Sequence, residues 1–201
     1  MLVQAQRPKR CEVPSIVITP STGSVLTFDE VAQQCRLDDD AERSYVEQVL
    51  IPSVSSMFEQ YTRCKLLSTV MEDAHAEWPC SGRLDLAFGP VKEVSSVTYL
   101  DLAGASQILL ASLYYVHSGS VRGVLHRLDT LPSMKCHPAA LRVRYTAGFG
   151  DTADDVPACV KHWMLAHIAS FMQNRESGGE AEFKVNSLFD GLIADYLYQS
   201  I

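Results

Sequence analysis

One cysteine and two histidines near the carboxyl end have the residue types and the spacing that chemistry requires. Cys159 and His162 are three residues apart, and His167 follows little more than one helical turn later. On a helix, this spacing lets a thiol and an imidazole share a metal ion or form a thiolate–imidazole pair. The pattern is therefore compatible with a small cytosolic metal-dependent or thiol enzyme, and this alternative stays open.

The same residues also fit a packing role, which we favour. His167 belongs to an apolar stripe, and no second group of Cys, His or carboxylate residues has the spacing of metal ligands. The sequence contains no HExxH motif, no GxSxG elbow and no Walker-type or dinucleotide-type glycine loop. We therefore expect no enzyme activity, no cofactor, and no catalytic or metal-binding residue.

Composition narrows the class of protein further. The chain has 201 residues, of which 47% are hydrophobic and 20% are charged, so it can bury a real core. The net charge of -7 argues against wrapping nucleic acid, because affinity for phosphates comes mainly from clustered Lys and Arg. No run approaches the roughly 20 apolar residues of a membrane span, so we expect no membrane partner and a cytoplasmic site of synthesis.

A helix expected over residues 156–175 must position the cysteine and the histidines. Pro157 suits a first helical turn, and Asp154 or Asp155 can accept bonds from the unpaired amides there. Apolar residues recur at three- and four-residue steps on one side of this helix, which predicts a buried stripe made of Val160, Trp163, Met164, His167, Ile168, Phe171 and Met172.

Two earlier helices are expected over residues 27–63. Thr27 and Glu30 have the spacing of a capping box at the start of the first. The three aspartates at 38–40 favour capping of the second helix over metal binding, because no further carboxylates have calcium-loop spacing. Pro52 should bend or divide that second helix, since it removes a backbone donor.

Short segments rich in Val, Leu, Tyr and Thr alternate with turn formers over residues 66–146, which indicates antiparallel sheet. In residues 141–145, apolar side chains alternate with two arginines, so one face should be buried and the other wet. The pattern predicts an α+β fold, with the terminal helices packed as a small helical bundle and an inserted antiparallel β lobe.

The two ends of the chain are expected to be appendages of a main domain over residues 27–176. Residues 1–26 form an extended lead-in, with an edge strand near residues 16–19. Residues 177–201 form a C-terminal arm, because two glycines follow the long helix before apolar residues resume at helical spacing. A short terminal helix on such an arm can reach a neighbouring molecule.

Short motifs follow one another along nearly the whole chain: IVITPS at 16–21, DDDA at 38–41, EQYTR at 59–63, FGPV at 88–91, VTYLD at 97–101, YTAGFG at 145–150, VP at 156–157 and NRE at 174–176. Each motif alone is weak, but their shared order resembles the tailed-phage head-tail connector proteins. These are the adaptors that dock beneath the portal ring.

The resemblance implies a structural protein of the virion neck, between capsid and tail. It implies a homo-oligomeric ring of about twelve subunits that meets the portal protein on one face and a stopper or tail-completion protein on the other. DNA would pass through the bore without specific binding, and an acidic lumen would let it slide. Another virion part, such as a head-closure or tail-completion protein, shares the same assembly logic and stays open.

The same resemblance points to the end of the chain as the part that contacts the portal or a neighbouring subunit. We expect the body to fold without this arm, because the apolar residues of the arm lie beyond a glycine hinge. The candidate interface residues are Arg175, Glu176, Phe183, Leu188, Phe189, Leu192, Tyr196 and Tyr198.

Overall fold

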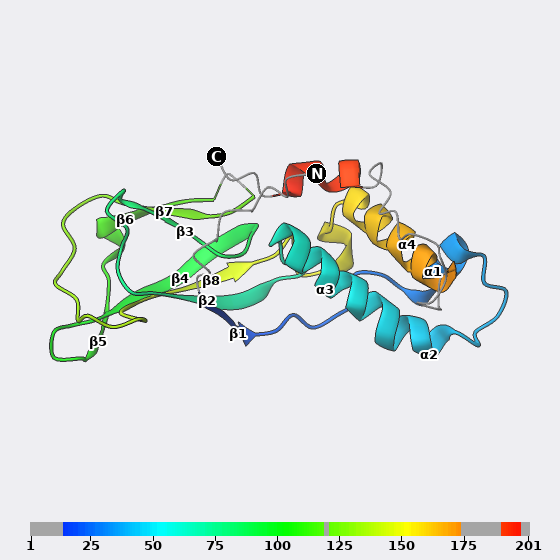
Figure 1. Ribbon diagram of the computed structural model, residues 1–201, viewed down its shortest axis with the longest axis horizontal. Coiled ribbons are helices and arrows are strands. Elements are labelled where there is room, and N and C mark those ends of the chain that lie inside the picture. The colour runs from blue at the N-terminus through cyan, green and yellow to red at the C-terminus, as the bar shows by residue number, and fades with distance from the viewer. Residues whose placement is uncertain (1–13, 119–120, 174–189, 198–201) are drawn as a thin grey trace, which may run out of the picture.

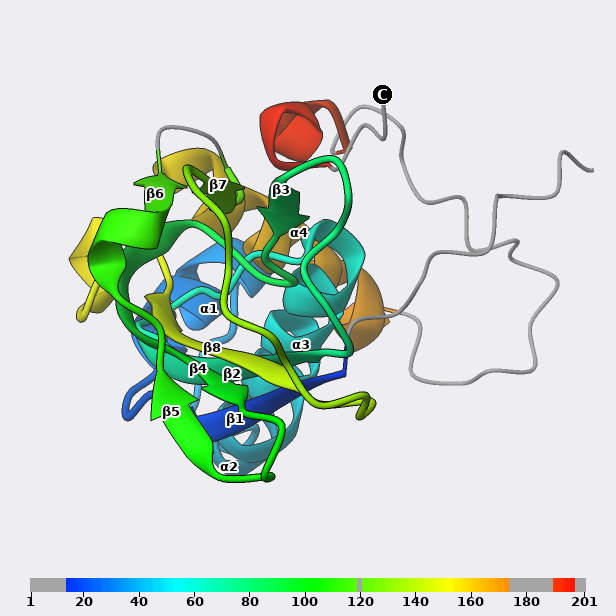
Figure 2. The ribbon, with the colours of Figure 1, turned by 90° about the vertical axis from the view of Figure 1, so that its left-hand side faces the viewer.

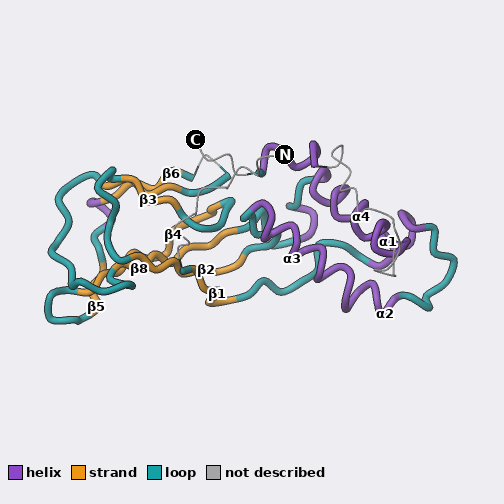
Figure 3. Tube along the Cα trace, viewed as in Figure 1, coloured by secondary structure: helices purple, strands orange, loops and turns teal. Residues whose placement is uncertain are grey.

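The structure is a computed structural model that describes residues 14–118, 121–173 and 190–197. The molecule is elongated, with helices at one end and two β-sheets at the other (Figure 1). Figure 3 shows the long helices gathered at one end of the molecule and the strands at the other, and along the chain seven of the eight strands lie between the first group of helices and the last long helix. The predicted α+β class is therefore confirmed. No helix in the described part is long and apolar enough to cross a membrane.

The helical end is built from both halves of the chain. The first half supplies α1 (Phe28–Cys35), α2 (Arg43–Tyr45), the π-helical turn η1 (Val46–Leu50) and α3 (Ile51–Thr62), and the second half supplies α4 (Ala158–Gln173). The predicted capping box at the start of α1 is confirmed. The Thr27 hydroxyl accepts a bond from the Glu30 amide, and the Glu30 carboxylate accepts one from the Thr27 amide.

A hydrophobic core fills the space between α1, α3 and α4. Trp163 of α4 meets Phe58 of α3 edge to face, with ring centroids 5.7 Å apart, and both side chains are buried. Four residues of the predicted stripe are buried, namely Val160, Trp163, Met164 and Ile168. The other three, His167, Phe171 and Met172, are half-buried at the border of this core.

Two details of the helices differ from the sequence-based expectation. The chain stays helical through Pro52, which lies in the first turn of α3 directly after the π turn η1. The wider π turn accommodates the missing proline amide without dividing the helix. Asp155 does not cap α4, because its carboxylate accepts bonds from the Thr152 amide and hydroxyl and so closes the short 3-10 turn η3 (Ala153–Asp155).

The larger sheet has five strands, in the order β1, β2, β8, β4, β5, and each neighbouring pair is antiparallel. Its strands are β1 (Ser15–Thr19), β2 (Thr69–His75), β8 (Leu141–Ala147), β4 (Val91–Leu100) and β5 (Ser106–Ile108). The predicted edge strand near the start of the chain is confirmed as β1. The predicted alternation in β8 is also confirmed, because Leu141, Val143 and Tyr145 are buried while Arg142 and Arg144 are exposed.

A second sheet of three strands covers one face of the first (Figure 2). Its strands, in spatial order, are β3 (Arg83–Asp85), β7 (Val124–Arg127) and β6 (Tyr114–His117), which follows the 3-10 turn η2 (Ala111–Leu113). A second hydrophobic core lies between the sheets and includes Met71, Leu84, Leu125, Leu141 and Val143. The opposite face of the five-stranded sheet, which we call the outer face, carries Glu72, Arg142 and Arg144.

Backbone hydrogen bonds tie the sheets to the helical end just after α3. The Lys65 amide donates to the Gly89 carbonyl at 2.7 Å, and the Ser68 amide donates to the Gly150 carbonyl at 2.7 Å. Gly148 is required at this crossing, because its φ is +144° and an added Cβ would lie 2.5 Å from the Leu67 carbonyl carbon. The two ends of the molecule are therefore joined by main-chain hydrogen bonds as well as by the chain itself.

One buried polar cluster holds the inner face of the large sheet to the segment before β4. The Asp73 carboxylate is fully buried and accepts bonds from the Tyr145 hydroxyl at 3.0 Å and from the Ala87 amide at 2.8 Å. The Tyr145 hydroxyl in turn accepts a bond from the Phe88 amide at 3.1 Å. Burial raises the pKa of Asp73 and of Tyr145, and it lowers the pKa of the neighbouring His75.

The raised pKa of Asp73 has a predictable effect on stability. Because folding raises this pKa above the ordinary value of 3.8, the folded chain binds the proton more tightly than the unfolded chain. The contribution of Asp73 to stability is therefore present at low pH and falls as the pH rises through the folded pKa. Urea unfolding of the wild type and of Asp73→Asn should show a stability difference, wild type minus variant, that shrinks as the pH rises above the ordinary pKa of 3.8. A difference that grows with pH would mean that the hydrogen bonds outweigh burial.

Candidate assembly surfaces

The structure places the cysteine and the histidines of α4 in packing contacts. Cys159 is half-buried against the helical core and hydrogen-bonds to Tyr196. The pKa of Tyr196 is raised, mainly because its side chain is buried and also because it interacts with Cys159. The His167 ring lies over Trp163, with centroids 3.8 Å apart, and its Nδ1 is 3.0 Å from the Trp163 carbonyl oxygen. His162 is exposed. Within the described ranges, no three His, Cys, Asp or Glu side chains are grouped to hold a metal ion.

Part of the predicted C-terminal interface packs on its own chain. The 3-10 turn η4 (Gly191–Tyr196) lies against α4, with Ile193 fully buried and Leu192 half-buried. Tyr196 meets Phe149 edge to face at a centroid distance of 5.3 Å. Removing the whole arm would therefore also remove a residue of the helical core. The other candidates, Arg175, Glu176, Phe183, Leu188, Phe189 and Tyr198, lie outside the described residues.

A polar groove crosses the outer face of the five-stranded sheet. Its walls come from β2, β4, β5 and β8, and it has a volume of about 410 Å³. Glu72 lies in it with only 10% of its side chain exposed and pairs with Arg144 at 2.8 Å and with Arg142 at 3.3 Å. The two guanidinium groups share a single carboxylate, and their side chains stay 46% and 52% exposed. The groove therefore presents positive charge to a partner.

Exposed aliphatic side chains lie at the edges and the tip of the β region. Ile108 of β5 is 74% exposed, and Ile16 of β1 is 55% exposed. Leu102, Leu110 and Leu128, which are all more than 60% exposed, lie in the loops around β5 and β7. Apolar side chains of this size are common at surfaces that become buried on assembly.

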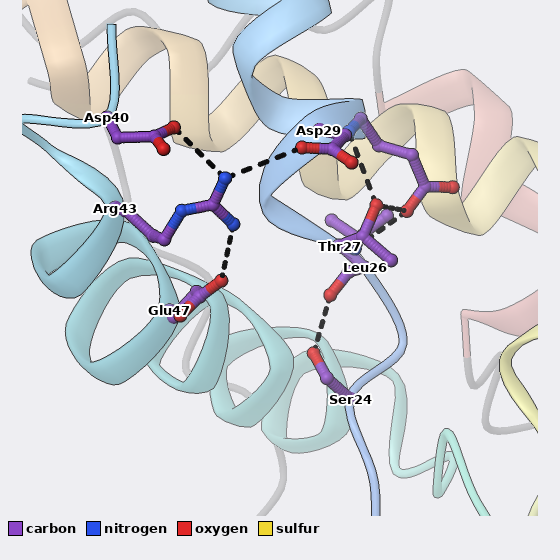
Figure 4. A network of polar contacts seen from close by, with 8 residues as sticks. Ser24, Leu26, Thr27, Asp29, Asp40, Arg43 and Glu47 are labelled. Carbon is purple, nitrogen blue, oxygen red and sulfur yellow. Dashed lines mark hydrogen bonds and ion pairs between the residues drawn. The ribbon is translucent and has the colours of Figure 1, made fainter.

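A charged network holds the opposite, helical end in one arrangement (Figure 4). The Arg43 guanidinium lies 3.0 Å from Asp40, 3.3 Å from Glu47 and 3.8 Å from Asp29, so it connects α1 to the start of α2. It also covers the Phe28 ring at 4.2 Å from the centroid. The Asp39 carboxylate accepts a bond from the Ala41 amide, but Ala41 precedes α2. The N-cap of α2 is Glu42, and it has no side-chain cap bond, so the expected capping of this helix by the three aspartates is wrong. The network therefore connects α1, the acidic run and η1 through one arginine side chain.

Several of these surface residues were not recognised as candidates in the sequence. Glu72 is separated from Arg142 by 70 residues and from Arg144 by 72, so their pairing depends on strand register and has no local signal. The alternating arginines of β8 were the one available clue, since they mark the exposed face of a strand. Ile108 lies in a short segment whose pattern does not distinguish an edge strand from a loop.

The fold is shared with solved chains from one kind of particle. The structure superposes on a chain in the virion of a native gene transfer agent (GTA) particle with a TM-score of 0.76. The two chains are 20% identical in sequence, and the match covers 93% of this chain and 96% of the other. A chain from the neck of an empty GTA particle computed with C6 symmetry gives a TM-score of 0.76 at 19% identity, over 94% and 97% of the two chains.

A chain from the neck of a native GTA particle computed with C12 symmetry gives a TM-score of 0.65 at 19% identity, over 92% and 97% of the two chains. At these identities the likeness establishes a common fold. No protein-family model matches the chain, and no curated protein matches it either.

Proposed function

We propose that this chain is a structural protein of the neck of a phage-like particle and serves there as the head-tail connector adaptor. About twelve copies form a ring beneath the portal and join the capsid to the tail. The observation that carries this proposal is the fold shared with GTA virion and neck chains over nearly the full length of both partners. The C12 symmetry used for one of those necks supports a ring of about twelve.

The ring has three kinds of partner in this proposal. One face meets the portal protein, and the other meets a stopper or tail-completion protein. The contact with the portal or a neighbouring subunit includes the arm residues named above, of which Leu192 and Tyr196 belong to the turn that packs against the body. DNA passes through the bore, and the net charge of -7 favours sliding over binding, because an acidic lumen repels phosphates.

The proposal is tested by mixing the purified full chain with purified portal rings and weighing the product by native mass spectrometry. We expect a complex that carries a closed ring of about twelve chains on each portal. Absence of any association, with both proteins folded, would overturn the adaptor role.

The same purified proteins distinguish the adaptor function from the alternative enzyme function that Cys159, His162 and His167 suggest. Those side chains pack against Tyr196 and Trp163, or are exposed, so Cys159→Ser and His162→Ala should join portals as the wild type does. Stoichiometric zinc or iron in elemental analysis, together with a turnover activity that either substitution abolishes, would favour the enzyme instead.

A further inference from the structure

The five-stranded sheet has two open edges, one at each end of its strand order. β1 forms one edge and β5 the other (Figure 2), and among the described residues no strand lies beyond either of them. An open edge carries unpaired backbone groups and can accept a further strand. β1 carries no charged residue to discourage such pairing; its sequence is SIVIT, and its three aliphatic side chains are 40% to 55% exposed.

The register identifies which backbone groups face outward at the β1 edge. The Ala74 amide donates to the Pro14 carbonyl, so Pro14 and Ala74 form a hydrogen-bonded pair of the antiparallel ladder. Such pairs alternate with pairs that turn their backbone groups away from the partner strand. Ser15 and Val17, which lie opposite Asp73 and Met71, therefore direct their N–H and C=O groups out of the sheet.

The β5 edge has a matching arrangement. The Leu109 amide donates to the Val97 carbonyl and the Asp101 amide donates to the Ala105 carbonyl, so the odd-numbered residues of this segment bond inward. Ser106 and Ile108 consequently direct their backbone groups outward. Each edge thus offers two outward-facing residues that are two positions apart.

Strand direction and side-chain placement also match between the edges. Four antiparallel steps separate β1 from β5, so the two strands run in the same direction. Ile16 lies opposite Glu72, and Ile108 lies opposite Thr98, which itself pairs with Arg142. Both isoleucines therefore lie on the outer face. If β1 of a second copy were added beside β5, its Ile16 would lie next to Ile108.

We propose that the β5 edge of one copy pairs in parallel with the β1 edge of the next copy, so that the five-stranded sheets continue from subunit to subunit around the ring. A second copy of this chain is the occupant that satisfies both edges at once, whereas an unrelated strand satisfies only one. The contact joins unlike surfaces and so closes into a ring at a fixed rotation. This inference rests on the ring of the proposed function and names its subunit contact.

Val17→Pro tests the pairing directly, because it removes an outward N–H and leaves the bonds between β1 and β2 in place. We expect the fraction of chains found in portal-bound rings to fall at least about tenfold, since every junction of the ring loses a hydrogen bond and gains a steric clash. Val17→Thr keeps the N–H and the branched shape and serves as the matched control, which should assemble as the wild type does.

Cross-linking gives a second measurement that does not depend on the proline. A chain in which Cys11, Cys80 and Cys136 are replaced by serine, and which carries Ile16→Cys and Ile108→Cys, is treated with a short thiol cross-linker after assembly. It should give a ladder of covalent oligomers that neither single cysteine substitution gives in the same background. If the wild type forms rings while Val17→Pro forms them equally well, or while the double variant gives no more oligomers than the single ones, the edge pairing is wrong and the adaptor role stands. If the wild type never joins a portal, the adaptor role itself fails.

Discussion

Replacing Ile193 with alanine is expected to lower the free energy of unfolding by about 3 kcal/mol. Ile193 belongs to the short turn η4 near the end of the chain, yet its side chain is fully buried against the helical core. The substitution removes three carbon atoms from a packed site and leaves a cavity behind. Urea unfolding followed by circular dichroism measures the loss.

Leu192→Ala is the matched control for this prediction. Leu192 is the neighbouring residue of the same turn and has a similar size, but it is only half-buried, so the loss should be clearly smaller. Equal and small effects for both variants would show that η4 does not pack on α4 in solution. In that case the whole segment would be available to a partner, as the sequence alone suggests.

Replacing Tyr145 with phenylalanine is expected to cost about 3 kcal/mol, because a buried carboxylate and a partly buried backbone amide each lose a hydrogen-bond partner. The Asp73 carboxylate loses the hydroxyl donor at 3.0 Å, and the Phe88 amide loses its acceptor at 3.1 Å. The ring itself stays in the core between the sheets, so the change isolates the polar contribution. Thermal and urea unfolding of the full chain provide the measurement.

Tyr115→Phe controls for removal of a tyrosine hydroxyl as such. Tyr115 lies on β6 and is 55% exposed, so this variant should change stability by less than about 0.5 kcal/mol. If Tyr145→Phe has an equally small effect, the cluster around Asp73 does not hold the large sheet to the segment before β4.

Features that depend on neighbouring residues could be predicted from the sequence. The capping box of Thr27 and Glu30 needs only a three-residue spacing, and the stripe of α4 needs only a helical period. The alternation of β8 likewise follows from the two-residue period of a strand. These local patterns are sufficient for the α+β class and for the position of the edge strand β1.

Features that depend on the tertiary arrangement could not be predicted. Pro52 has no local signal for the π turn that lets the helix continue, and Asp155 could cap either of two adjacent turns. The pairing of Glu72 with Arg142 and Arg144, and the outward groups of Val17 and Ile108, follow from strand register. A surface that serves assembly is defined by such long-range placement and by no sequence motif.

We propose that copies of this chain form the ring that joins head to tail. Cryo-electron microscopy of the particle neck, reconstructed without imposed symmetry, tests it most directly. We expect one ring of about twelve copies of this fold between portal and tail, with sheets running on from subunit to subunit through β1 and β5. A neck in which this fold is missing, or is present as a single copy, would contradict it.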